Sequence, residues 1–518
     1  MNDFRTLTPQ QAWEKIKSYR ENNYDSLAAL YSGDEEQLKL TAEPGSFWQR
    51  KNGTCRIHVP LASDIAATSA NLMFSMEPTY VVVHGGKEDS ESKGQKRLEE
   101  LIAKNLVASK LNEGAETCAA LGDVYLKLRW NKKINYPLLD VVQPDQAWPE
   151  YLLGECRCIH FFTIIASDAD RDRYVRAYEC YSRGKIITKL FDGKFGDLGI
   201  EMSKEATQEF GFEPETNPPI DDLLAVHIPN IRPNRKYRSS MFGRSDLDGL
   251  RDMFDSLDET YTSWMRDIRL AKARMIVPAE YLRKHKVPEG MEQALESYGA
   301  WEFDADVEAY VAMDINTDGL TNNGITLSQF DIRAQEHSFT CIQTIQSILQ
   351  YAGYSPNSFG MNTEGAAASG YALKVRERKS AITKNKKLTY WQSPLEQILT
   401  SMIHLDHALY PQAGSDSADT VSVAFADTMG ADATMLAETV QMLHTAQSAS
   451  VRTRVRMMHP DWGEQQVNEE VDTIKKEYLI EGESPDMMIG DNEKPNKNNP
   501  DDKTPDGEND EGGDEVNE

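Results

Sequence analysis

The sequence predicts a helix-rich α+β fold, and three stretches of the chain carry this prediction. Residues 245–275 repeat apolar side chains in alternating steps of three and four, the pattern of a long helix with a sustained heptad seam. Residues 123–228 contain short apolar runs separated by polar turns, which predicts antiparallel strands. Residues 370–409 form another long helical stretch, whose second half again steps by four and three.

The first 244 residues are expected to form an α+β body. This region opens with a helical pattern over 9–30, and 56–76 combines a short strand with an apolar helix. A β-branched strand at 79–84 precedes a helix at 92–111 and another from about residue 113. Six strands are expected after these helices, at 123–130, 138–142, 157–166, 174–181, 185–191 and 223–228.

The helix over 245–275 has clear start and stop signals. Ser245 is suited to cap its N-terminus, arginines and a lysine gather toward its C-terminus, and Pro278 ends it. Its length of about 46 Å requires a partner along most of the rod. The apolar surface is also wider than a two-stranded contact needs. Two interpretations stay open: a helix in a ring of packed helices, or a long core helix of a large monomer.

The second half of the chain alternates helices with connecting segments. Residues 276–326 form a compact insert, with strand-like runs at 301–303 and 307–311. A second helix over 327–352 ends at Gly353, and the small, polar residues of 354–369 predict a mobile loop. Pro394 predicts a kink in the helix that follows the loop. The remaining elements are a strand at 420–425 and helices at 434–446, 450–458 and 464–480.

Composition limits the classes of function. No run approaches a membrane span and the N-terminus lacks the features of a signal peptide, so we expect the protein in a cytoplasm, with its six sparse cysteines reduced. A net charge of −27 argues against a large surface that grips nucleic acid, although it permits DNA to slide past. Residues 483–518 form an acidic, apolar-poor tail that we expect to be disordered.

No catalytic motif is visible, and we expect no enzyme activity, no cofactor and no metal. Cys156-x-Cys158 with His160 could begin a zinc site, but no second Cys or His pair follows at a suitable spacing. The stretch from Asp314 imitates the start of a calcium loop, yet its twelfth position is Ile325 instead of a glutamate. Both are better read as a strand and a turn.

One basic cluster stands out on this acidic chain. It comprises Lys374, Arg376, Arg378 and Lys379, and is continued by Lys384, Lys386 and Lys387. A solvated helix face explains it, as does contact with a phosphate backbone or with an acidic neighbour across a subunit interface.

The order of these parts resembles tailed-bacteriophage portal proteins of the SPP1 type, over residues 56–480. The most specific signals are Pro233-Asn234 and Gly243-Arg244-Ser245-Asp246-Leu247 before the long helix. The run 369–373, Ser-Gly-Tyr-Ala-Leu, follows the small polar loop. Each signal is short, and their order along the chain carries the resemblance.

The resemblance implies a ring of usually twelve subunits at one capsid vertex, through which double-stranded DNA is packaged and later ejected. Implied partners are the terminase large subunit, scaffold and major capsid proteins, and head–tail connector proteins, with assembly in the host cytoplasm. The implied parts are a wing (1–244), a stem helix (245–275), a clip (276–326), a second stem helix (327–353), a tunnel loop (354–369), a kinked wing helix with its returning strand (370–429) and a helical crown (430–482).

Candidate residues follow from these positions. The seam residues Phe254, Leu257, Tyr261 and Trp264 are expected at the subunit interface. The DNA channel would be lined by Asn357, Phe359, Met361, Asn362, Thr363 and Glu364. The motor would dock on the clip at Arg283, Lys284, His285 and Lys286. Two rival interpretations stay open. One is a nuclease or ATPase, which would need a phosphate loop or clustered metal-binding carboxylates, and neither is visible in the sequence. The other is a monomeric or oligomeric scaffold or adaptor without a DNA channel.

Overall fold

A computed structural model describes most of the chain. The described residues are 6–50, 55–85, 87–88, 92–131, 134–168, 170–271, 274–278, 311–313, 326–328, 332–361, 370–425, 433–459, 462 and 464–481. The chain divides into two compact units, Met1–Gly430 and Ala431–Glu518. Within the described ranges, no helix is both long and apolar enough to cross a membrane.

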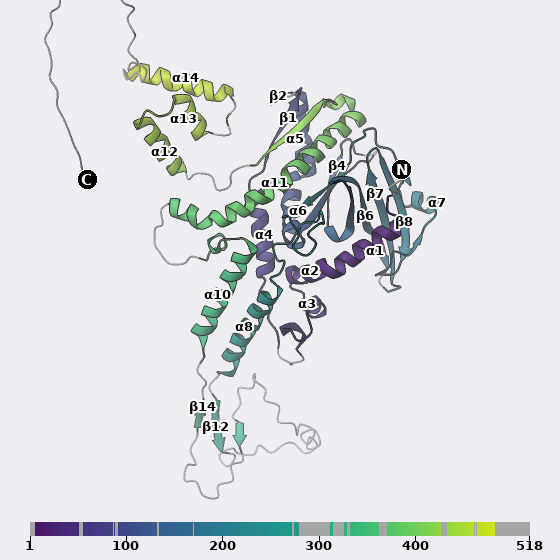
Figure 1. Ribbon diagram of the computed structural model, residues 1–518, viewed down its shortest axis with the longest axis vertical. Helices are drawn as coiled ribbons and strands as arrows, with labels where there is room; N and C mark the ends of the chain where they lie inside the picture. Colours follow the sequence, from purple (N-terminus) through teal and green to yellow (C-terminus); the bar gives the residue numbers. More distant parts are fainter. Residues whose placement is uncertain are drawn as a thin grey trace, which may run out of the picture. The chain divides into compact units, whose positions relative to one another are not determined.

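The first unit combines helices with four sheets (Figure 1). Its α-helices are α1 (Pro9–Tyr19), α2 (Asp25–Ser32), α3 (Glu35–Thr41), α4 (Leu61–Phe74), α5 (Lys93–Asn105), α6 (Val107–Leu121), α7 (Lys204–Glu209), α8 (Arg251–Leu270), α10 (Ala334–Ala352) and α11 (Gly370–Leu409). A π-helical turn, Arg20–Tyr24, joins α1 to α2, so the helical pattern predicted over 9–30 forms nearly continuous helix.

Three of the four sheets lie in the body that was predicted to be α+β. Their strands are β1 (Thr79–His84), β2 (Lys87–Glu88), β3 (Asp123–Arg129), β4 (Leu138–Val142), β5 (Ala147–Leu152), β6 (Glu155–Asp168), β7 (Arg173–Ser182), β8 (Lys185–Gly193), β9 (Ile200–Glu201), β10 (Glu215–Thr216), β11 (Ala225–Pro229) and β15 (Asp419–Ala424). The sheet orders are β15-β1-β2, β10-β8-β7-β6-β5 with β9 beside β8, and β11-β3-β4. The α+β prediction is confirmed, and β5 is a strand that the sequence did not predict.

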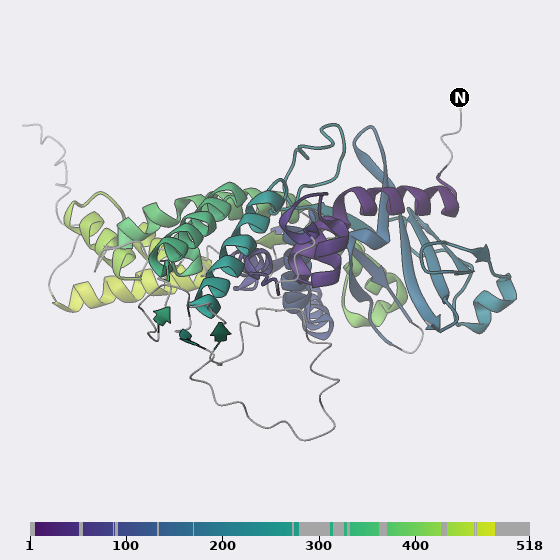
Figure 2. The same cartoon turned by 90° about the horizontal axis from the view of Figure 1, so that it is seen from below.

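The main core joins these three sheets to α11. The predicted seam of α11 is confirmed, because Trp391, Leu395 and Ile398 are fully buried in one cluster with the strands β3 and β11. A second pair of segments, α1 and the sheet of β5 to β8, shares a separate core in which Ala12 and Ile16 pack on strand residues. Figure 2 shows α1 lying along this sheet. Pro394 lies inside α11, whose two halves run in different directions in Figure 1.

The two long helices that flank the insert are shorter than predicted. The first begins at Arg251 instead of Ser245 and ends at Leu270, and the second begins at Ala334 instead of residue 327. Ser245 does not cap α8, because the helix begins only at Arg251; its buried hydroxyl donates to the carbonyl groups of Ala119 and Ala120 and accepts from the Leu247 amide. The predicted end at Gly353 is confirmed by its left-handed backbone, φ 102°.

The chain leaves this helix pair as strands. β12 (Arg274–Pro278) pairs with β13 (Val311–Met313) and β14 (Thr326–Ser328), so Met275 and Pro278 belong to a strand and do not continue or end the helix. The other predicted features of the insert lie outside the described residues: the run 301–303, the calcium-like stretch 314–325 and the four basic residues at 283–286.

In its described residues the second unit contains three helices, α12 (Ala433–Thr445), α13 (Val451–Met458) and α14 (Glu464–Glu481), which agree closely with the predicted ranges. Ser450 caps α13 by accepting a hydrogen bond from the Thr453 amide. Val455, Val467 and Val471 form a small core between α13 and α14. The acidic tail from residue 483 lies outside the described residues.

Candidate functional site

The helices α8 and α10 pack side by side and lead to the strands of the insert (Figure 1). Their contact is apolar near the body, where Phe254 and Leu257 of α8 share a buried cluster with Ile348 and Leu349 of α10. Each of these four side chains is at most 1% exposed. Burial of such side chains stabilises a contact by roughly 1.5–3 kcal/mol each.

Farther from the body, polar groups hold the same pair of helices together. Asp267 of α8 accepts hydrogen bonds from the Nε2 of His337 at 3.0 Å and from the Arg333 guanidinium at 2.9 Å. These bonds, that of His337 first, lower the pKa of Asp267. The Trp264 ring stacks on His337 with an interplanar angle of 10° and centroids 6.4 Å apart.

This packing corrects the predicted subunit interface. Phe254 and Leu257 are covered by their own chain, so they are not available to a neighbouring subunit. Tyr261 and Trp264 are partly buried against the same cluster. The seam seen in the sequence is the contact between α8 and α10 of one subunit, because the partner that it requires comes from the same chain.

The large exposed apolar side chains of this pair lie mainly on α10. Phe339 is 64% exposed and Ile342 is 41% exposed, and their spacing of three places them on one face of the helix. Cys341, Ile348 and Leu349 face α8 instead. Tyr351, at 71%, and Ile268 of α8, at 42%, add further exposed apolar surface. Exposed apolar patches of this kind mark interaction surfaces.

A buried polar junction connects four segments at the base of the helix pair. Its members are Ser69 of α4, Asp246 before α8, Tyr354 after α10 and Lys387 of α11. Lys387 donates to Asp246, to the Ser69 hydroxyl at 2.6 Å and to the Tyr354 hydroxyl at 2.9 Å. Tyr354 donates to the same Asp246 carboxylate at 2.7 Å. Lys387 and Tyr354 are each 1% exposed, so this charge pair is desolvated and depends on its hydrogen bonds.

The first part of the predicted tunnel loop is fixed to α11. The Ser355 amide donates to the Ser380 hydroxyl at 2.8 Å, and the Ser358 hydroxyl donates to the same oxygen at 2.8 Å. Phe359 and Met361 pack against the cluster of α8 and α10. The predicted mobile loop was 354–369; these contacts hold its first part, 354–361, and 362–369 lies outside the described residues. Asn357 lies in the 3₁₀ turn of this segment, and Asn362, Thr363 and Glu364 lie outside the described residues.

The basic cluster separates into two environments. Arg376, Arg378 and Lys379 lie on the exposed side of α11, where Lys379 donates to the Gln350 carbonyl of α10. The lysines at 384 and 387 are buried, which corrects the expectation that the whole run faces solvent or phosphate. The side chain of Lys374 lies outside the described residues.

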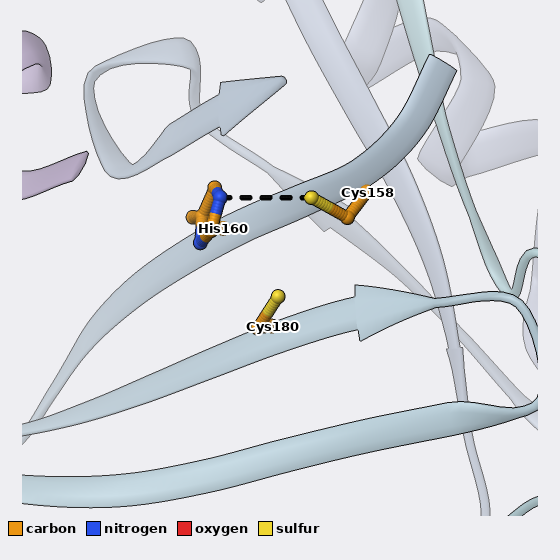
Figure 3. A group of neighbouring side chains, drawn as sticks. All are labelled: Cys158, His160 and Cys180. Carbon is orange, nitrogen blue, oxygen red and sulfur yellow. Dashed lines mark hydrogen bonds between the residues drawn. The ribbon is translucent and has the colours of Figure 1, made fainter. Parts of the chain in front are cut away.

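The sequence missed one group of side chains in the sheet of β5 to β8. A β-bulge beside Glu150 turns Cys156 toward the main core, while Cys158 points into the core shared with α1. The register of β6 and β7 pairs His160 with Cys180, so a thiol from another strand joins Cys158 and His160 (Figure 3). The prediction against a zinc site rested on spacing along the sequence, which does not include this thiol, because strand pairing brings it close.

The charges of this group are mutually stabilising. The pKa of Cys180 is lowered, first by a hydrogen bond with Cys158 and then, against the effect of burial, by bonds with His160 and Tyr178. Burial lowers the pKa of His160, but hydrogen bonds with Cys180 and Glu150 outweigh it and raise this pKa to about 9.

Comparison with models of protein families gives a match that covers most of the chain. The family model described as phage portal protein, SPP1 Gp6-like, matches residues 14–479. The comparison with curated proteins finds no match.

Solved structures with similar chains come from gene transfer agent particles. A chain in the virion of a native particle is 12% identical with a TM-score of 0.41, and the alignment covers 83% of this chain and 92% of that one. Chains in two necks, one empty with C6 symmetry and one native with C12 symmetry, are also 12% identical. Their TM-scores are 0.42 and 0.39, with 77% and 83% of this chain covered and 90% and 92% of theirs. The family assignment rests on the sequence model, not on these likenesses.

Proposed function

The chain belongs to the SPP1 Gp6-like family of phage portal proteins, and from this premise we propose that twelve copies form a ring at one capsid vertex that conducts double-stranded DNA. The observation that carries the proposal is the family match over 14–479, which spans every part from α1 to α14. The family is structural rather than enzymatic. We further propose that this chain turns over no nucleotide itself and receives its driving force from a terminase motor.

In this proposal α8 and α10 form the stem, and neighbouring subunits meet at the exposed face of α10. Phe339 and Ile342 support this assignment, because water covers them in the isolated subunit and a neighbouring copy would remove them from water. A ring repeats the same contact at each step, so one apolar face per subunit must meet a different face on the next subunit.

The acidic composition suits a channel through which DNA slides. A net charge of −27 disfavours the persistent phosphate contacts that would hold the duplex in place. We propose that 354–369 forms the tunnel loop, with its base fixed to α11 and Glu364 facing DNA. Glu364→Lys is then expected to slow packaging by rings of normal mass, with an effect that weakens as salt rises. Packaging at the unmodified rate would refute a channel role for this charge.

The insert 276–326 is proposed as the clip that docks the motor and later the connector proteins. Arg283, Lys284, His285 and Lys286 are suited to bind an acidic partner. Reversing these charges is expected to weaken binding of the terminase large subunit while rings still form. Scaffold and major capsid proteins are the expected partners around the ring, which we propose assembles in the host cytoplasm and remains in the virion.

Imaging of the purified full chain tests the proposed function. Negative-stain electron microscopy is expected to show rings with a central hole, and twelvefold averages are expected to sharpen them. A homogeneous particle with the single-chain mass of 58.4 kDa, measured by light scattering, would instead favour the scaffold or adaptor without a channel.

A further inference from the structure

We propose that Cys158, His160 and Cys180, with Glu150 as the fourth ligand, form a structural zinc site in the sheet of β5 to β8. The inference does not depend on the ring or on DNA. The thiol and imidazole groups of the first three residues are buried, and their ligand atoms lie within 4.8 Å of one another (Figure 3). Two sulfur ligands and one nitrogen are a donor set that selects Zn²⁺ over Mg²⁺ or Ca²⁺.

The distances fit a tetrahedral ion. The Sγ of Cys158 lies 3.7 Å from the Nε2 of His160. Zinc–sulfur and zinc–nitrogen bonds of ordinary length at a tetrahedral angle place these two atoms about 3.6 Å apart. The Oε1 of Glu150 lies 2.6 Å from the same Nε2, although this carboxylate does not belong to the group whose ligand atoms all lie within 4.8 Å of one another. To become the fourth ligand, it must give up this hydrogen bond and rotate toward the other three ligand atoms.

The surrounding residues prepare His160 to bind a metal through Nε2. Its other nitrogen, Nδ1, bonds the Tyr178 hydroxyl at 2.8 Å. Once Nε2 gives up the proton that it shares with Glu150, a neutral imidazole that donates from Nδ1 presents the Nε2 lone pair to the ion, which is the arrangement that outer-shell partners impose on metal-binding histidines. Tyr178 thus acts as a positioning residue. The same Oε1 of Glu150 also accepts a hydrogen bond from the Leu7 amide at 2.7 Å.

The place of the site in the fold defines its role. Glu150 lies on β5, Cys158 and His160 on β6, and Cys180 on β7, so one ion would join three adjacent strands. Because Glu150 also holds the chain just before α1, the ion would stabilise the docking of α1 on this sheet. Binding releases the thiol protons and the proton shared by His160 and Glu150 to solvent, with no change in oxidation state.

Cobalt titration of the full-length chain tests the site directly. The reduced protein, stripped of metal with a chelator, is titrated with Co²⁺ and then with Zn²⁺. We expect one Co²⁺ per chain, with a thiolate-to-cobalt charge-transfer band and the intense visible bands of a tetrahedral ion, followed by displacement by Zn²⁺. The zinc-loaded chain should also melt several degrees above the stripped chain. Absence of the charge-transfer band from the reduced chain would overturn the proposal.

Variants identify the ligands. Cys158→Ser and Cys180→Ser are each expected to weaken zinc binding by at least about tenfold, and Glu150→Gln by a similar factor. Cys156→Ser is the matched control, because its thiol lies two residues from Cys158 but faces the other core, and it should bind normally. Retention of the cobalt spectrum in the double variant of Cys158 and Cys180 would refute the site. A Cys158–Cys180 disulfide that persists under reducing conditions would also refute it and would indicate a redox pair.

Discussion

The buried polar junction at the base of the helix pair and the outer face of α10 each hold side chains of a type that is uncommon at such a position. In the junction, defined by Ser69, Asp246, Tyr354 and Lys387, a charge pair is buried where apolar groups are the rule. On the outer face of α10, Phe339 and Ile342 meet water where polar groups are common. The first arrangement joins segments of a single subunit, and the second is the surface that we propose for contact with a neighbouring subunit.

The comparison separates two kinds of variant. A change in the junction should lower the stability of the subunit and affect the ring only as a consequence. A change on the outer face of α10 should leave the subunit stable and prevent the ring. The contact between α8 and α10 lies between these extremes, because it is apolar like the outer face and buried like the junction.

The largest expected loss of stability follows from breaking the junction. Lys387→Met leaves the Asp246 carboxylate buried without its cation, which should lower the free energy of unfolding by about 3–5 kcal/mol. Urea unfolding of the full chain, followed by circular dichroism, measures this change. Lys386→Met is the matched control, because Lys386 is exposed and should change stability by less than about 0.5 kcal/mol. Equal losses of stability in the two variants would show that the buried Lys387 contributes no more to stability than the exposed Lys386.

A comparable or smaller loss of stability is expected when the apolar contact between α8 and α10 is disturbed. Leu257→Ala creates a cavity between α8 and α10 and should lower the free energy of unfolding by about 2–5 kcal/mol. Thermal unfolding compares it with Ser256→Ala at the neighbouring exposed position. If Leu257→Ala left subunit stability intact and abolished only the ring, Leu257 would belong to the subunit interface after all.

The smallest expected effect is on the stability of the subunit at low pH. Because its hydrogen bonds lower the pKa of Asp267 in the folded chain below the ordinary 3.8, the carboxylate contributes stability above pH 3.8. That contribution is lost as the pH falls through the lower folded value. Pairs near solvent contribute less than about 1 kcal/mol. Asp267→Asn should remove this part of the acid dependence in melting temperatures measured between pH 2 and 5, and an unchanged profile would contradict it.

The sequence identified what is local and missed what depends on register or on distant contacts. The seam through Phe254 and Leu257 was visible as a helical period, but a period does not say whether its partner is another chain or α10 of the same chain. Lys387 appeared as one lysine in a basic run, because Asp246 lies 141 residues away along the chain.

The same limit applies to the candidate ligands. Cys158 and His160 were noticed together, whereas Cys180 joins them only through the pairing of β6 with β7. Ser245 has the residue type of a helix cap, but its hydroxyl serves contacts with Ala119, Ala120 and the Leu247 amide, and the helix begins six residues later. The fold class, most helix and strand positions and the family resemblance were predictable because they depend on pattern and order.

The most direct test of the account is the mass of the assembly formed by Phe339→Asp. The variant should melt at nearly the same temperature as the unmodified chain, since Phe339 is 64% exposed in the subunit. Leu153→Asp is the matched control, because it places the same charge at a fully exposed leucine in the turn between β5 and β6. By mass photometry the unmodified chain and the control should form rings, and Phe339→Asp should remain near 58.4 kDa. Rings of normal mass from Phe339→Asp would contradict the assignment of this face to the subunit interface.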